Sequence, residues 1–177
     1  KAPTNMRLTE RDKQIMLAIF QHEGVLTQAQ IMTLFGMHES KVRLRLRFLY
    51  HSGYINRVDK ATQHKSPRRD IYWLDKPGAQ LVAGLLNEPF SMRFAWRREP
   101  KWGTLAHDIH LNDTRIRLSQ QAKMTEGIGL VEWLGEAELR RFPSEITYQM
   151  PSELGTGEIL TNRRRVITDG YCVLKVA

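Results

Sequence analysis

The first third of the chain contains three short amphipathic segments, each opened by a hydroxyl residue that can cap a helix and closed by a glycine. The opening residues and the glycines that follow them are Thr9 and Gly24, Thr27 and Gly36, and Ser40 and Gly53. Between them, apolar residues recur at spacings of three and four, which is the period of a helix buried on one face. The pattern therefore predicts three short helices that pack on one another, because none of them can bury its apolar face alone.

The third segment allows two interpretations. Its residues 42–48 alternate strictly between apolar and basic, which is a strand signal. The cap at Ser40 and the strong helix formers that follow favour a helix over residues 41–51 instead. As a helix it would bury Val42, Leu46 and Leu49. The opposite face would then present Ser40, Arg43, Leu44, Arg47 and His51.

Two strands and a fourth helix are predicted after the third helix. Residues 54–58 alternate like a strand, residues 71–74 are apolar and aromatic, and the polar loop between them is rich in Lys and Arg. Pro77 fits the first turn of the next helix. The order of elements over residues 8–86 resembles a winged helix-turn-helix domain, in which residues 40–55 match the recognition helix and the strand that follows it. This resemblance implies that the third helix enters the major groove of DNA.

Positive charge is concentrated in this part of the chain. The whole sequence has 27 Lys and Arg against 19 Asp and Glu, a net charge of +8, and residues 40–69 hold nine basic groups and one acid, Asp59. Such a balance favours partners that carry phosphate, with nucleic acid first and anionic lipid second. A solvated charged face is the alternative interpretation of the same residues.

The second half is predicted to form a small α+β domain. We expect a helix over 104–124, strands over 128–134 and 171–176, a short helix over 136–141, and an exposed loop over 143–162. The segment before it, residues 88–103, interleaves Arg with four aromatic residues, Phe90, Phe94, Trp96 and Trp102. Such a segment can stack on single-stranded nucleic acid, although a linker that packs its aromatic rings on its neighbours is favoured.

Three short motifs of the second half carry a further resemblance. They are Leu105–Asp113, which holds His107 and the pair Asn112-Asp113; Glu132-Trp133-Leu134-Gly135-Glu136; and Thr168-Asp169-Gly170. Together with the N-terminal pattern they resemble the replication-relaxation proteins of plasmids and conjugative elements. In that family the third motif is usually Pro-Asp-Gly, a turn that leads into a strand, whereas this chain has Thr168 in place of the Pro. The sequence ends within a predicted strand, which indicates a truncated C-terminal domain.

Two catalytic or metal-binding hypotheses arise from the same residues. His107, His110 and Asp113 are spaced to share a helix face and could hold a divalent metal, but no further ligands complete the site. Glu132, Asp169 and Lys175 suggest a magnesium-dependent nuclease, or a nicking accessory, of the restriction type. Val173 stands where such a motif needs an acid, so a degenerate nuclease-like fold without activity is favoured. The lone Cys172 excludes an intramolecular disulfide.

The sequence thus predicts an α+β protein that reads double-stranded DNA. Its domains would be a winged helix-turn-helix over 1–87, a linker over 88–103 and an α+β domain over 104–177. The predicted DNA-binding residues are Ser40, Lys41, Arg43, Leu44, Arg47, Arg57, Lys60, Lys65, Arg68 and Arg69. Lys41 and Arg43 are expected at base edges and most of the others at phosphates. We expect a cytoplasmic protein without enzymatic activity, cofactor, metal or membrane contact, which acts in replication, mobilisation or transcriptional control. It would act with a replication or mobilisation protein, or as a homodimer. A winged domain that binds a protein partner is the remaining alternative.

Overall fold

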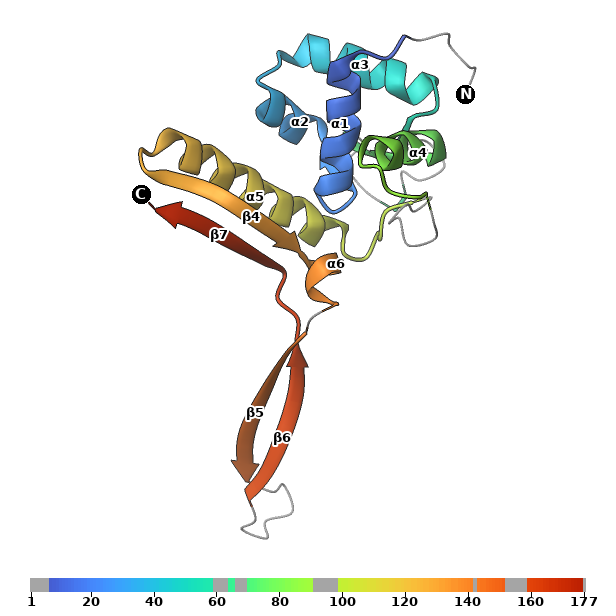
Figure 1. Ribbon diagram of the computed structural model, residues 1–177. Coiled ribbons are helices and arrows are strands. Elements are labelled where there is room, and N and C mark those ends of the chain that lie inside the picture. The colour runs from blue at the N-terminus through green and yellow to red at the C-terminus, as the bar shows by residue number, and fades with distance from the viewer. Residues whose placement is uncertain are drawn as a thin grey trace. The chain divides into compact units, whose positions relative to one another are not determined.

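A computed structural model describes residues 7–58, 64–65, 70–90, 99–141, 143–151 and 159–176. The protein has an α+β fold, as predicted, and divides into two compact units, Lys1–Gln120 and Gln121–Ala177 (Figure 1). Each unit contains its own antiparallel strand pairs.

The first unit contains the predicted order of three helices, two strands and a fourth helix, with one strand added. Its elements are α1 (Glu10–Gln21), β1 (Val25–Thr27), α2 (Gln28–Phe35), α3 (Glu39–His51), β2 (Ile55–Arg57), β3 (Ile71–Leu74) and α4 (Lys76–Leu85). The strands form one antiparallel sheet in the order β1-β3-β2. The sequence analysis did not predict β1, since three residues before a helix cap are too few to show a period.

The predicted caps of α1 and α2 are confirmed, whereas that of α3 is wrong. Thr9 caps α1 in a capping box with Asp12, and Thr27 caps α2 in a second box with Gln30. Helix α3 begins at Glu39, and the His38 side chain accepts a hydrogen bond from the Ser40 backbone N–H. Ser40 therefore lies within the first turn, because the His38 side chain acts as the N-cap and satisfies the backbone N–H of Ser40 itself.

The core of the first unit confirms that residues 42–48 are helical. Val42, Leu46 and Leu49 are at most 1% exposed and pack with residues of α1, β2, β3 and α4. A strand would have placed Val42, Leu44 and Leu46 on one face, but Leu44 is 48% exposed. Burial of the three apolar side chains outweighs the alternating pattern, because each contributes about 1.5–3 kcal/mol.

Helix α4 passes so close to the end of α3 that only glycine fits at one position. A Cβ on Gly78 would lie 2.1 Å from the Tyr54 carbonyl oxygen, whereas a Cβ on Gly84 of the same helix would meet nothing within 4 Å. Tyr54 also accepts a hydrogen bond from the Asp75 backbone N–H at 2.9 Å, which holds this contact in place.

Gly78→Ala is therefore expected to lower the free energy of unfolding by about 1–3 kcal/mol, because backbone must move to make room. Gly84→Ala should raise it by about 0.5–1 kcal/mol through helix propensity alone. Chemical denaturation of the two variants measures the difference. Equal effects would contradict the close approach of α4 to Tyr54.

Helix α5 (Leu105–Met124) is bound to the first unit through its N-terminal part. The buried Asn112 side chain donates to the carbonyl oxygens of His22 and Val25 at 3.0 and 2.9 Å. The Gln30 side chain donates to the Ile109 carbonyl oxygen and to Asp113 at 2.9 and 2.8 Å. These bonds extend the compact unit to Gln120, beyond the boundary predicted at residue 87.

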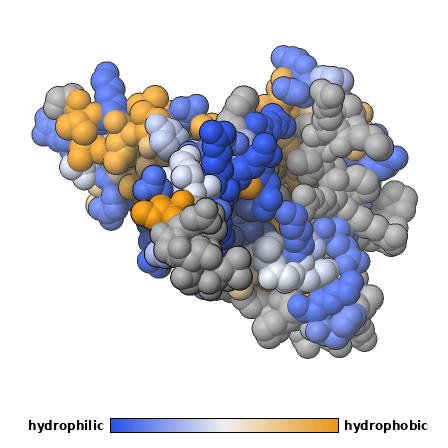
Figure 2. Space-filling model, turned by 90° about the horizontal axis from the view of Figure 1, so that it is seen from below, coloured by the Kyte–Doolittle hydropathy of each residue, from blue (hydrophilic) through white to orange (hydrophobic). Residues whose placement is uncertain are grey.

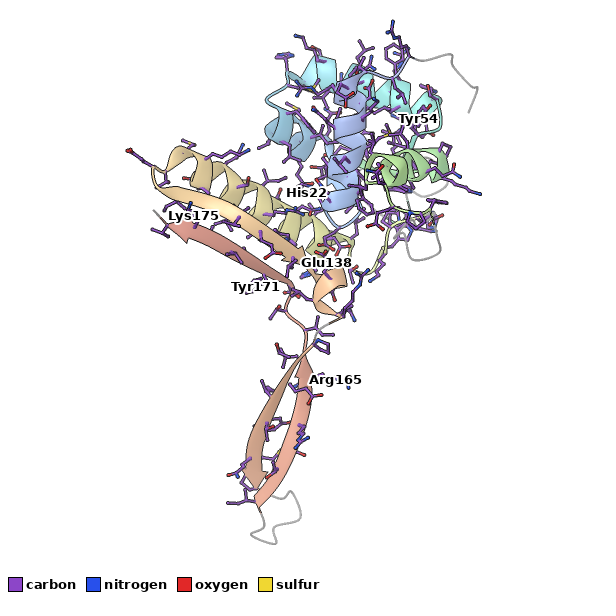
Figure 3. All side chains as sticks on the ribbon, in the orientation of Figure 1. His22, Tyr54, Glu138, Arg165, Tyr171 and Lys175 are labelled. Carbon is purple, nitrogen blue, oxygen red and sulfur yellow. The ribbon has the colours of Figure 1, made fainter. Side chains whose placement is uncertain are left out.

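His22 lies at this junction between α1 and α5 (Figure 3). Its ring Nδ1 is 2.8 Å from the Ala18 carbonyl oxygen. Burial and the neighbouring Arg115 guanidinium lower the pKa of His22 to about 4 from its ordinary 6.5. The unfolded chain therefore binds a proton more readily than the folded protein between these two values, so stability falls as the pH drops from 6.5 to 4.

The loss across this pH window should be about 3 kcal/mol, because each pKa unit corresponds to 1.36 kcal/mol. His22→Gln should flatten the dependence of unfolding free energy on pH, while His51→Gln, at an exposed position of α3, should leave it unchanged. Urea titrations at pH 7, 5.5 and 4.5 test this. A slope that survives in His22→Gln would assign the dependence to other groups.

The second unit consists of a long strand pair and a two-stranded ribbon inserted into it. Strand β4 (Ile128–Gly135) pairs with β7 (Gly170–Val176), with a bulge between Leu130 and Glu132. Between these strands lie α6 (Glu136–Leu139), β5 (Ser144–Pro151) and β6 (Ile159–Val166), and β5 pairs with β6. The β4–β7 pair carries exposed apolar side chains, and Figure 2 shows the surface of the protein coloured by hydropathy. These side chains are Val131, Tyr171, Leu174 and Val176.

The prediction of an exposed loop over 143–162 is wrong in its secondary structure. Residues 144–151 and 159–162 are in strands, and most of their side chains are exposed as predicted. Ser, Thr and Pro suggested a loop, but the backbone groups of β5 pair with those of β6 across the intervening segment. Among the described residues, no helix is long and apolar enough to cross a membrane.

Candidate nucleic-acid interface

The outward face of α3 carries half of the ten predicted DNA-binding side chains. Five of these side chains are exposed and opposite the buried row of the helix, namely Ser40, Lys41, Arg43, Leu44 and Arg47. We call this set the α3 surface. Its rigidity follows from the buried row, because Val42, Leu46 and Leu49 hold the helix against the core.

Arg45 differs from the other basic residues of α3, since it faces the protein. Its guanidinium donates to both carboxylate oxygens of Asp12, with Nε 2.8 Å from Oδ1, and only 24% of its side chain is exposed. Asp12 is fully buried. Burial raises the pKa of Asp12, but hydrogen bonds from Arg45 and Thr9 outweigh that effect and hold it below its ordinary value. Arg45 thus fixes α3 to the start of α1.

Strand β2 adds cationic charge on one side of the α3 surface. The Arg57 guanidinium lies 4.6 Å from the centre of the Tyr50 ring. It also hydrogen-bonds the Tyr72 side chain, whose pKa is raised by burial despite the opposing effect of Arg57 and Arg43. Arg43 itself pairs with Glu39 at 3.2 Å and is 72% exposed. Arg57 and Arg43 therefore face the same region, beside the sheet.

Helix α1 adds a cation on the other side, which the sequence analysis missed. Arg11 is exposed and lines a shallow hollow together with Lys41 and Leu44. Its guanidinium lies 5.6 Å from the centre of the Phe35 ring. The sequence carries no signal for this position, because Arg11 comes near α3 only through the packing of α1, which the contact of its neighbour Asp12 with Arg45 shows. Exposed Phe48 was likewise not predicted as part of the surface.

The loop between β2 and β3 is only partly described. Lys60, Arg68 and Arg69 lie outside the described residues, so their predicted phosphate contacts stay predictions. Lys65 pairs with Glu99 at 2.8 Å and lies 5.6 Å from the centre of the Trp102 ring. Lys65 must therefore exchange Glu99 for a phosphate if it is to bind DNA.

Trp102 packs within the first unit, as expected of a linker that covers its neighbours. Its ring meets Trp73 edge to face at 5.9 Å, and its Nε1–H donates to Glu99 at 2.8 Å. In this position the Trp102 ring contacts Trp73 and Glu99, so it is not presented for stacking on single-stranded nucleic acid. Phe94 and Trp96 lie outside the described residues.

The structure does not support the metal site predicted at His107, His110 and Asp113. Asp113 accepts a hydrogen bond from Gln30, which ties it to α2. In the described part of the chain, no three His, Cys, Asp or Glu side chains lie close enough to hold a metal ion. The pair Asn112-Asp113 is thus explained by the attachment of α5 to the first unit.

The residues of the nuclease hypothesis are separated along the β4–β7 pair. Glu132 lies opposite Val173, four residues beyond Asp169, which corresponds to roughly 13 Å along a strand. Oxygen ligands of one Mg²⁺ must lie within about 5 Å of each other, since each is about 2 Å from the ion. Lys175 lies further still, opposite Gly129. This arrangement does not favour cleavage chemistry at these residues.

Comparison with known proteins gives one match. A family model described as replication-relaxation matches residues 17–176, which is most of the chain. No curated protein and no solved structure matches the chain. The match spans the α3 surface as well as the second unit.

Proposed function

The chain belongs to the replication-relaxation family, and from this premise we propose that it binds double-stranded DNA at a specific sequence. The binding element would be a winged helix-turn-helix formed by α1 to β3, with α3 as its recognition helix. The family's name supports a role in the replication of plasmids or conjugative elements. Within that role, the protein would act in replication, mobilisation or transcriptional control.

The observation that carries this proposal is the exposed basic face of α3 opposite a fully buried apolar row. A helix of about 12 Å diameter fits the major groove, where base edges can be read. The cations of Arg11 and Arg57, on either side of α3, would meet the two phosphate backbones that border a groove. The β1-β3-β2 sheet supports the same assignment, because β2 and β3 form the hairpin that a wing requires.

Each residue of the α3 surface can be given a role. Arg43 would pair bidentately with a guanine, and Lys41 would contact a second base edge. Leu44 would meet a thymine methyl group, and Ser40 would hydrogen-bond a base or a phosphate. Arg47 would bind phosphate together with Arg57, and Lys60, Lys65, Arg68 and Arg69 would do so from the wing. A homodimer on a palindromic site, or a complex with a replication or mobilisation protein, would add specificity.

Selection of binding sites from random double-stranded DNA tests the proposal. We expect enrichment of one sequence, and a logarithm of the binding constant that falls linearly with the logarithm of salt concentration. Two similar half-sites in the enriched sequence would support a dimer. If no sequence is enriched and the binding constant does not depend on salt concentration, the proposal fails, and a protein partner becomes the expected ligand of the α3 surface.

A further inference from the structure

The β5–β6 ribbon is an exposed element that the proposed function does not use. Its strands pair over eight positions, from Ser144 opposite Val166 to Pro151 opposite Ile159. Seven of the eight β5 residues are exposed, and Figure 1 shows β5 and β6 as a two-stranded ribbon. An isolated two-stranded ribbon is only marginally stable in water. A binding partner would therefore stabilise a ribbon of this kind.

The charge of the ribbon indicates the chemistry of its ligand. Arg163, Arg164 and Arg165 follow one another on β6, and Glu145 is the one acid among the described residues of both strands. Glu145 pairs with Arg165 at 3.4 Å. Arg163 and Arg164 make no ion pair with any residue that the structure describes. This excess of cationic charge is suited to phosphate groups.

One face of the ribbon is polar over three of its four residue pairs. Since side chains alternate, Arg163 and Arg165 share a face with the residues of β5 that lie opposite them or next in register. The polar part of that face, which we call the arginine face, consists of Glu145, Thr147, Gln149, Thr161, Arg163 and Arg165, and the pair Pro151 and Ile159 ends it. Figure 3 shows Arg165 projecting from the side of the ribbon. The other face carries Ile146 and Tyr148 beside Arg164.

We propose that the arginine face of the β5–β6 ribbon is a second surface for double-stranded DNA, separate from α3. This inference rests on the proposed function. Eight residues of strand span roughly 26 Å, or about eight base pairs. The major groove admits a two-stranded ribbon, so Thr147 and Gln149 can face bases while Arg163 and Arg165 bind phosphates. This contact would add affinity to the one that α3 makes.

Charge-matched variants of the full chain test the inference on the selected DNA. Arg163→Gln combined with Arg165→Gln should weaken binding by roughly tenfold or more and lower the salt slope by about 0.9 for each lost phosphate contact. Arg140→Gln combined with Arg141→Gln removes the same charge from α6 and its C-terminal end, and should change neither quantity by as much. Arg163→Lys with Arg165→Lys should keep the salt slope. Equal losses in the two glutamine variants would overturn the inference.

Crosslinking provides a measurement that is independent of affinity. A photoreactive label on Thr147→Cys, in a Cys172→Ser background, should attach to the DNA, whereas the same label on Glu138→Cys of α6 should attach far less. Attachment only to a second copy of the chain would overturn the inference and assign the ribbon to dimer formation. If Arg43→Ala abolishes sequence preference while ribbon variants change nothing, the ribbon inference fails and the proposed function stands. If the unaltered chain binds no DNA, both fail together.

Discussion

Arg45→Ala is expected to lower the free energy of unfolding by about 3 kcal/mol or more, although Arg45 lies among the arginines of the α3 surface. The variant leaves the carboxylate of Asp12 fully buried without its cation. Removing one partner of a buried ion pair costs about 3–5 kcal/mol. Thr9 still donates its backbone N–H and its hydroxyl to Asp12 at 2.7 Å each, which places the loss at the lower end. Chemical denaturation measures the loss.

Arg47→Ala is the matched control, because Arg47 is exposed on the same helix. Its unfolding free energy should stay within about 0.5 kcal/mol of the parent. The dependence of the unfolding free energy on pH in the acid range provides a second measurement. The lowered pKa of Asp12 gives stability that is present above its ordinary pKa of 3.8 and is lost as the pH falls through the folded-state value. Arg45→Ala should move this acid transition to higher pH, and an unmoved transition would contradict the pairing.

The helices and their buried faces were predictable because apolar residues that recur about every 3.6 positions are easily recognised in the sequence. The buried row of α3 and the caps at Thr9 and Thr27 were predicted from the spacing of the residues. Arg45 of the same helix faces the protein and contacts Asp12. Its partner could not be predicted, because the two residues are 33 positions apart and meet only through packing of α1 on α3.

The missed features have two physical causes. In β5, Ile146, Tyr148 and Met150 alternate with polar residues, which is a strand signal, but the Ser, Thr, Gly and Pro residues around them outweighed it in the prediction of a loop. The other cause is that contacts between distant segments leave no periodic signal in the sequence. The contacts of Asn112 and Gln30 join segments about 80 residues apart. The family resemblance indicated that the Asn-Asp pair matters but could not say that it fixes α5 in place.

Arg43→Ala is expected to weaken binding to the selected DNA site by about 1–3 kcal/mol, or roughly 5- to 150-fold, and to relax one base position. Arg43 is 72% exposed and its nearest charged partner is Glu39, at 3.2 Å, so the folded protein loses little when it is removed. A scrambled sequence should lose much less affinity, because it offers no guanine in register. Titrating the selected and the scrambled DNA with the parent chain and with Arg43→Ala gives the ratio of the two dissociation constants for each protein, which measures its sequence preference.

Arg43→Lys separates the two ways in which this residue could act. Lysine keeps the charge but not the planar pair of donors, so it would restore a phosphate contact and not a bidentate contact with guanine. We expect Arg43→Lys to retain the salt slope and still lose the base preference. Lys123→Ala, which removes one exposed charge at the end of α5, should leave the preference intact. If Arg43→Ala instead weakens binding to both DNAs equally, Arg43 contacts phosphate, and the base-reading role passes to the remaining side chains of the α3 surface.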